Sequence, residues 1–190
     1  MPPSREADLA TPQPTLTTTR LVLRAFVLED APAVTAHLGT PEIAANTARI
    51  PFPYEQHMAE TWIASHGRDW DEQREVTFAV TLAGTGTLIG AVGFVLDLAN
   101  RQAELGYWLG KPYWGRGYAS EAARRIVGWG FDELDLNRIH AGYMTHNPAS
   151  GQVLTKLGMQ HEGLRREHLI KNGRPVDVVV TGLLRRDWKP

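Results

Sequence analysis

Apolar residues recur at two spacings along the first part of the chain, and each spacing predicts a type of secondary structure. Alternating apolar and polar residues over 20–26 predict a first strand. Acidic residues before an Ala-Pro pair, followed by a glycine cap, predict a short helix over 31–38. An apolar stripe at helical spacing predicts a second helix within 51–67. The chain therefore begins with a strand and two helices.

The centre of the chain changes to alternation with a period of two and to residues that favour strands. The segments 77–84 and 87–98 flank Thr85-Gly86, a pair typical of a hairpin turn. A third alternating run over 102–109 predicts one more strand beside them. Together these segments predict an antiparallel meander.

Helical and extended patterns alternate again in the last third of the chain. Apolar and small residues on one face predict an amphipathic helix over 119–130. The strand predicted over 137–143 follows this helix as a crossover, so it is expected to lie parallel to 102–109. An Asn-Pro start predicts a helix over 147–157, and a long hairpin around a type I′ turn follows over 159–184. The pattern predicts an α/β (α+β) fold, with a mixed, mostly antiparallel sheet of about seven strands flanked by about four helices.

Length and composition agree with one globular domain. The chain has 190 residues, of which 43% are hydrophobic and 22% charged, and this is enough for a core without disulfides. We expect a single domain over 16–190, preceded by a flexible tail over 1–15. No apolar run approaches ~18 residues, and the start lacks the pattern of a signal peptide. We therefore expect a cytoplasmic protein with no membrane partner.

Charge and cysteine content exclude several classes of function. The 20 Lys and Arg residues balance 21 Asp and Glu residues, and no basic run occurs, so no nucleic-acid partner is expected. The absence of cysteine excludes iron–sulfur clusters, cysteine-ligated zinc and a thiolate nucleophile. The histidine spacings match no known ligand pattern, so no metal is predicted.

The segment WGRGYASEA over 114–122 joins a predicted strand to a predicted helix. Helix starts bind anions through free N–H groups, and glycines let a phosphate approach the backbone. A tight turn would also explain these glycines, so the segment alone leaves phosphate binding open. Ser120 stands at the third glycine of a dinucleotide fingerprint, and the Gly-Lys-Ser/Thr of a phosphate loop is absent. Both of these nucleotide-binding motifs are therefore excluded.

Three segments in fixed order resemble the GNAT superfamily of acetyl-CoA-dependent N-acetyltransferases, and most closely its RimJ/RimL-like branch. They are AELGYWLGKPYWGRGYASEA, NPASGQVLTKLGMQHEGLRRE and NGRPVDVVVTGLLRRDW, and the resemblance covers roughly residues 16 to 188. It implies a sheet splayed at its centre, near a bulge at Tyr107 to Leu109, with the cofactor's pantetheine arm lying in the gap. Family members are often homodimers, so a homodimer is a further expectation.

The resemblance also implies which residues bind acetyl-CoA. The window 114–119 is expected to hold the pyrophosphate through backbone amides, with Trp114 replacing the usual Gln or Arg. The backbone at 108–109 is expected to pair with pantetheine, Asn147 to contact the same arm, and Lys156 to reach toward the far end. The predicted set is Trp108, Leu109, Trp114, Gly115, Arg116, Gly117, Tyr118, Ala119, Asn147 and Lys156.

Two residues are predicted to act in catalysis. Many family members place a tyrosine acid seven residues after the asparagine, where this chain has Leu154. By the same resemblance, Ser150 takes the place of the serine acid of the RimJ/RimL-like branch. Glu104 is the candidate general base, and Glu162 and Glu167 are runners-up. Two structural alternatives stay open, because Glu104 could be a solvated strand residue and Ser150 a first-turn helix residue.

The predicted reaction is direct attack of an amine on the thioester, because the chain has neither a cysteine nor a nucleophile-elbow serine. Deprotonating an α-amine at pH 7 costs about 1.4 kcal/mol, whereas a lysine costs about 4.6 kcal/mol. A base therefore matters less for an N-terminal amine, and the resemblance to the RimJ/RimL-like branch implies a protein N-terminal amine as the acceptor. A small-molecule amine and a catalytically silent acetyl-CoA-binding module are the alternatives.

Overall fold

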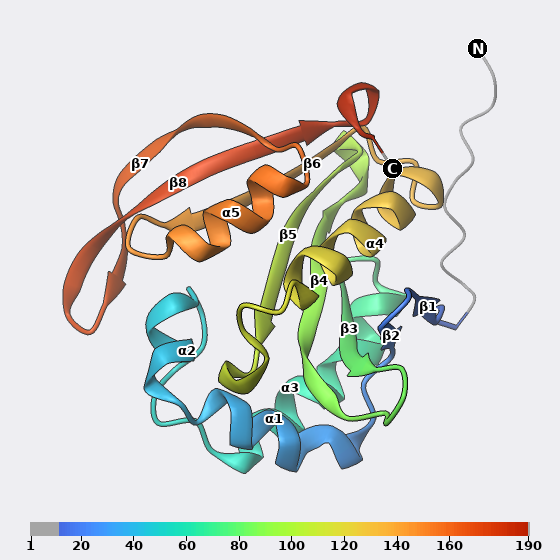
Figure 1. Cartoon of the computed structure of the whole chain (residues 1–190), viewed down its shortest axis with the longest axis vertical. Coiled ribbons are helices and arrows are strands. Elements are labelled where there is room, and N and C mark those ends of the chain that lie inside the picture. The colour runs from blue at the N-terminus through green and yellow to red at the C-terminus, as the bar shows by residue number, and fades with distance from the viewer. Residues whose placement is uncertain (1–11, 190) are drawn as a thin grey trace.

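The computed structural model describes residues 12–189, which are organised around one mixed sheet (Figure 1). The sheet has the strand order β1-β2-β3-β4-β5-β6-β8-β7. Its strands are β1 (Leu16–Thr17), β2 (Leu21–Arg24), β3 (Glu75–Leu82), β4 (Leu88–Asp97), β5 (Gln102–Leu109), β6 (Arg138–Met144), β7 (Gln160–Lys171) and β8 (Arg174–Leu184). Strands β5 and β6 are parallel, and the other neighbouring pairs are antiparallel. The predicted mixed sheet is confirmed, including the parallel crossover at its centre.

Helices cover both faces of this sheet (Figure 1). Helix α4 packs against one face in a core that includes Phe78 and Phe94. Helices α1 and α3 pack against the other face, on Ala79, Ala91 and Trp108. The α-helices in the described residues are α1 (Ala31–Leu38), α2 (Pro41–Asn46), α3 (Gln56–Asp71), α4 (Tyr118–Asp132) and α5 (Pro148–Lys156).

The structure adds two short elements to those that the sequence predicts. Strand β1 has two residues and helix α2 has six, so neither is long enough to show a periodic pattern. The remaining strands and helices match predicted segments. The predicted type I′ turn between β7 and β8 fits the positive φ angles of Asn172 (51°) and Gly173 (72°).

Small residues bring α4 close to the sheet. Ala122 and Ala123 are fully buried near the helix start. At Gly130 an added Cβ would lie 2.8 Å from the Phe94 ring, which is too close for a larger residue without a shift. This close packing fixes the start of α4 beside the end of β5, where the candidate chemistry lies.

Strands β5 and β6 part after a short parallel pairing. They pair only from Gln102 to Glu104 on β5 and from Arg138 to His140 on β6. Beyond these residues β5 stays paired with β4, and β6 stays paired with β8. The predicted central splay is thus present. The predicted bulge near Tyr107 to Leu109 is wrong, because β5 keeps one register against β4 along its whole length.

Two further expectations from the sequence concern the N-terminal tail and the lack of membrane-spanning segments. The expected tail covers 1–15, of which residues 1–11 lie outside the described residues. Within the described part, Gln13 Nε2 donates a hydrogen bond to the Thr77 carbonyl at 3.0 Å. None of the helices over residues 12–189 combines the length and the apolar character needed to cross a bilayer.

Candidate functional site

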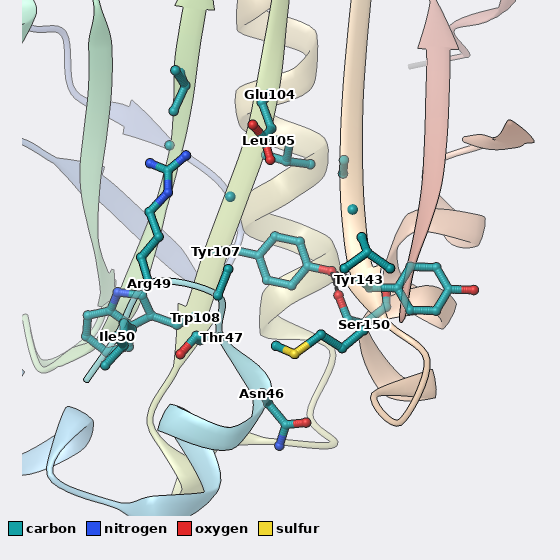
Figure 2. A pocket seen from close by; sticks show the side chains of 18 of the residues that line it. Asn46, Thr47, Arg49, Ile50, Glu104, Leu105, Tyr107, Trp108, Tyr143 and Ser150 are labelled. Carbon is teal, nitrogen blue, oxygen red and sulfur yellow. Dashed lines mark hydrogen bonds between the residues drawn. The ribbon is translucent and has the colours of Figure 1, made fainter. Parts of the chain in front are cut away.

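A cavity of about 480 Å³ opens where β5 and β6 part (Figure 2). Its floor comes from strands β3 to β6, and β7 and β8 contribute one wall. The segment Asn46 to Ile50, which begins at the last residue of α2, forms the opposite wall. Figure 2 shows this segment passing over the sheet beside Trp108, with Tyr107 and Ser150 on the far side of β5.

A row of ladder partners places polar side chains across the floor. Glu75 pairs with Val95, Val95 with Glu104, and Glu104 with His140, so these four lie side by side across β3 to β6. All four line the cavity. Two carboxylates and an imidazole therefore face the same space.

The next row on the same face has almost no side chains. Thr77 pairs with Gly93, and Gly93 pairs with Gly106. A Cβ added at Gly106 would meet nothing within 4 Å, which indicates open space above that position. Gly106 thus leaves the sheet open beside Glu104, so a substrate could approach the backbone there.

His140 is neutral at neutral pH. Burial lowers its pKa from the ordinary value of 6.5, with further lowering from Arg138 and Arg165, while the charge of Glu104 acts in the opposite direction. The imidazole can therefore accept a proton or a hydrogen bond beside the Glu104 carboxylate.

Two hydroxyl groups meet at the other edge of the gap. The Tyr107 Oη lies 2.7 Å from the Ser150 Oγ and donates to or accepts from it, and it also lies 3.2 Å from the Ser150 carbonyl oxygen. Burial raises the pKa of Tyr107 to about 12, although the hydrogen bond with Ser150 acts against this shift. The phenol therefore stays protonated. Sequence reasoning missed Tyr107 as a site residue, because nothing in a strand pattern shows that its hydroxyl reaches α5.

Asn147 positions the start of α5. Its Oδ1 accepts a hydrogen bond from the Ser150 backbone N–H at 3.2 Å, as a helix N-cap does. Its Nδ2 donates to the Asn46 carbonyl at 3.4 Å, and His146 Nε2 contacts the Ala45 carbonyl at 3.0 Å. The turn before α5 thus holds the end of α2 and the wall segment that follows it.

The backbone of β5 turns alternate amides toward the gap. Gly110 N–H donates to the Ile89 carbonyl at 2.8 Å, so Gly110 and every second residue before it face β4. On the opposite side, the Leu109 carbonyl accepts a hydrogen bond from Trp114 Nε1 at 2.7 Å. By this alternation the amides of Tyr107 and Leu109 point into the gap, and that of Trp108 belongs to the ladder with β4.

The predicted anion-binding turn has left-handed backbone at two positions. Gly115 has φ = 73°, and Gly117, the N-cap of α4, has φ = 79°. Such angles strongly favour glycine, and left-handed positions of this kind occur in turns whose backbone N–H groups bind anions. Arg116 between them is exposed. The start of α4 therefore combines the N–H groups of a helix N-terminus with the exposed cation of Arg116 just before it.

Arg20 fixes this turn from β2's side of the sheet. Its Nη1 donates to the Arg116 carbonyl at 3.0 Å, and its guanidinium lies 4.6 Å from the centre of the Tyr118 ring. Arg20 also forms an ion pair with Glu121 at 2.6 Å. Although burial favours the neutral acid, hydrogen bonds from Thr18 and Arg20 hold the pKa of Glu121 below its usual range. Sequence reasoning missed Arg20, which lies far from the turn along the chain.

The other predicted residues lie at different distances from the gap. Lys156 is exposed in the last turn of α5, and its carbonyl accepts a hydrogen bond from Arg124 at 2.9 Å. Glu162, a runner-up base, is paired with Arg138, and that hydrogen bond holds its pKa below the usual range. Glu167 has a backbone N–H that donates to Asp177 at 2.7 Å. Neither glutamate is among the cavity-lining residues of the described chain.

Comparisons with known proteins agree with this geometry. A family model described as an acetyltransferase (GNAT) domain matches residues 20–160. The chain is 36% identical over 175 residues to the uncharacterized N-acetyltransferase p20 of Bacillus licheniformis, covering 92% of this chain and 98% of that protein. It is 36% identical over 105 residues to the ribosomal protein uS5-alanine N-acetyltransferase of Escherichia coli, covering 54% of each.

The fold is also similar to that of a solved structure. A ribosomal L7/L12 α-N-protein acetyltransferase, RimL, in complex with coenzyme A, superposes with a TM-score of 0.83 over 90% of this chain and 98% of that one. At 18% identity this likeness concerns the fold alone.

Proposed function

The chain belongs to the GNAT acetyltransferase family, and from this premise we propose that it transfers the acetyl group of acetyl-CoA directly to a protein N-terminal α-amine. The observation that carries the proposal is the gap between β5 and β6, which opens beside the glycine turn of α4 and leads into a cavity with a carboxylate on its floor. The relative that acetylates the alanine of ribosomal protein uS5 supports this choice of acceptor.

The start of α4 suits the pyrophosphate of acetyl-CoA by its charge and its backbone donors. The pyrophosphate is anionic, and a helix N-terminus with left-handed glycines presents backbone N–H groups to such a group. The exposed Arg116 adds a cation. The Trp114 side chain has a structural role, because its indole N–H donates to the Leu109 carbonyl and so links the turn to the end of β5.

The pantetheine arm is an amide-bearing chain, and the open edge of β5 can bind it as a strand binds its neighbour. The amides of Tyr107 and Leu109 face this edge, so we assign the backbone contacts to these two residues. Asn147 stands at the opposite edge as the cap of α5. The thioester then lies between β5 and the start of α5.

In the reaction, the amine nitrogen forms a bond to the acetyl carbon, and the bond between that carbon and sulfur breaks. The leaving thiolate takes a hydrogen bond or a proton. We assign this task to the Ser150 hydroxyl, which can donate to sulfur while Tyr107 donates to it. Because the pKa of Tyr107 is about 12, its hydroxyl remains a hydrogen-bond donor to Ser150. It does not lose its proton to the leaving thiolate, since an ordinary thiol has a pKa of about 8.5.

The amine must lose a proton before or during attack. Glu104 faces the cavity beside the hollow at Gly106 and beside the neutral His140, so it can take that proton directly or through a water. An N-terminal amine makes a smaller demand on such a base than a lysine does, since its ordinary pKa of about 8 leaves roughly a tenth of it neutral at pH 7.

The experiment is an acetyl-transfer assay that follows release of coenzyme A from acetyl-CoA. The acceptors are peptides with a free N-terminus, the same peptides with a blocked N-terminus and one internal lysine, and a set of small amines. We expect transfer to the free N-terminus, located by mass spectrometry. Transfer to small amines alone would reject the protein acceptor, and binding of acetyl-CoA without transfer to any acceptor would identify a silent module.

A further inference from the structure

Charges of opposite sign occupy different parts of the cavity. The carboxylates Glu75 and Glu104 lie on the strands of the floor. Two guanidinium groups stand on the walls, Arg49 on the segment after α2 and Arg165 on β7. An amine acceptor alone would have use for the carboxylates, but it would be repelled by the arginines.

Arg49 has no ion pair and no hydrogen bond with any residue of the described chain 12–189. Its side chain extends from the wall segment along the sheet, in the direction of the end that carries Glu104 (Figure 2). The segment itself is held at Ala45 and Asn46 by the turn before α5. Arg49 is thus presented to the cavity from an anchored stretch of backbone.

Arg165 faces the same space from the opposite wall. Within the described residues its one hydrogen bond joins Nη1 to His168 Nε2 at 3.4 Å, and no carboxylate pairs with it. Its charge acts on His140 on the cavity floor. By contrast Arg138, on β6 and separated from β7 by β8, is paired with Glu162. The cationic charge that remains unpaired at the cavity therefore comes from both walls.

Resting on the proposed function, we propose that the acceptor carries a carboxylate close to its reactive amine, and that Arg49 and Arg165 bind this carboxylate while Glu104 receives the amine. A guanidinium matches a carboxylate with two parallel hydrogen bonds. The same two cations disfavour an acceptor with a basic residue near its N-terminus. Two sources can supply this chemistry, namely a peptide with an acidic second or third residue and a free amino acid.

The test compares acceptors that differ in one charge. One peptide sequence is made with Asp, Asn or Lys at the second or third position, and the panel also holds the free N-terminal amino acid and its amide. A charge-assisted hydrogen bond predicts a preference for Asp over Asn of about tenfold or more in kcat/KM, and a further loss with Lys. The preference should weaken with added salt, because exposed charges are screened.

Variants assign the preference to the two arginines. We expect Arg49→Gln and Arg165→Gln each to raise KM for the acidic acceptor several-fold, with little change for the neutral one. Arg49→Glu should shift the preference toward the Lys peptide. The matched control is Arg166→Gln, an exposed neighbour on β7 that does not line the cavity, and it should leave the preference unchanged.

Each outcome decides between the two claims. Equal rates for the Asp and Asn peptides, with Arg49→Gln behaving like Arg166→Gln, overturn the carboxylate inference and leave the proposed function standing. Transfer to the free amino acid but to no peptide supports the carboxylate inference and overturns the protein acceptor. Transfer to none of the panel, with acetyl-CoA still bound, overturns both.

Discussion

The two sides of the gap between β5 and β6 use different parts of the chain to form a site. On the side of α4, the proposed recognition comes from backbone N–H groups at Gly115 and Gly117, whose angles follow from a few consecutive residues. On the side of the cavity floor, it comes from side chains on elements far apart in sequence, such as Glu104 on β5, Arg49 after α2 and Arg165 on β7.

This difference determines how readily each side of the gap can change its ligand. A backbone site for a pyrophosphate depends on turn geometry more than on the side chains of the turn. A side-chain site changes its ligand whenever one charge changes. The α4 side therefore suits a constant donor, and the floor and walls suit an acceptor that differs from one relative to another.

The largest effect is expected on the floor, from Glu104→Gln. Loss of a general base costs about a hundredfold or more, so kcat/KM should fall by that amount at pH 7. Binding of acetyl-CoA, measured by calorimetry, should not change, because the glycine turn is intact. Part of the lost rate should return at high pH, where the free amine is neutral without help.

Glu75→Gln is the control for this experiment. Glu75 lines the same cavity in the same row, separated from Glu104 by Val95 on β4, so the two lie about 10 Å apart. It should affect rates by less than about threefold. Equal losses in the two variants would show that the floor acts through its total charge and that Glu104 is not the base.

Sequence alone could predict the α4 side because its information is local. The residues WGRGYASEA combine two glycines, a strand end and an amphipathic helix, and the structure has left-handed glycines at the predicted turn. The splay itself was predicted correctly, but its predicted cause, a bulge in β5, was wrong. The splay begins where the pairing of β5 with β6 ends, after Glu104 and His140, so it depends on two strands that are distant in sequence. The expected bulge would have involved one strand alone.

A substitution at the glycine turn has the next largest effect. Gly115→Val places a β-branched residue at φ = 73° in the turn, and it should weaken acetyl-CoA binding by about tenfold or more. The control is Gly86→Val in the turn between β3 and β4, where φ is 69° and an added Cβ likewise meets nothing within 4 Å. Both variants carry the same backbone strain.

Calorimetry with acetyl-CoA and thermal unfolding separate binding from stability in this pair. The two variants should lose similar stability, and only Gly115→Val should lose affinity. Equal affinity for acetyl-CoA in the two variants would show that the turn only connects β5 to α4. The proposed backbone binding site would then be rejected.

The hydroxyl pair tests whether one strand and one helix act as a unit. Ser150→Ala and Tyr107→Phe should each lower kcat by about tenfold, and the double variant should lose little more than either one, since the Tyr107 hydroxyl acts through Ser150. KM for acetyl-CoA should change little. Losses that multiply in the double variant would show independent roles, and an unchanged Tyr107→Phe rate would leave Ser150 to act alone.

The cavity side could not be predicted because its parts become neighbours only through the fold. Helix α2 is too short to leave a pattern, and the wall segment after it has no motif. Tyr107 looks like an ordinary strand residue until the tertiary structure brings the Ser150 hydroxyl beside it, and the same holds on the α4 side for Arg20 and its partner Glu121. Partners that depend on packing between distant elements are not encoded in local spacing.

The smallest effect concerns stability on the cavity side. His66 on α3 packs against the rings of Phe26 and Trp62 at 5.2 and 4.6 Å, and its ring nitrogens have no hydrogen-bond partner in the described residues. Burial lowers its pKa from 6.5 to about 4, against the pull of Asp69. Between these values the unfolded chain binds a proton that the folded chain does not, so stability falls as pH falls. From pH 7.5 to 6.0 the expected loss is about 1 kcal/mol.

Chemical denaturation of the full chain at these two pH values measures this loss. His66→Phe keeps an aromatic ring but cannot titrate, so the difference in unfolding free energy between pH 7.5 and 6.0 should shrink by about 1 kcal/mol. His161→Gln, which replaces an exposed histidine on β7, serves as the control and should keep the wild-type difference. If His66→Phe keeps it as well, the acid sensitivity arises elsewhere. If the difference shrinks as expected, protonation of His66 destabilises the helices that support Trp62 and Trp108. The glycine turn of α4 does not share this loss of stability.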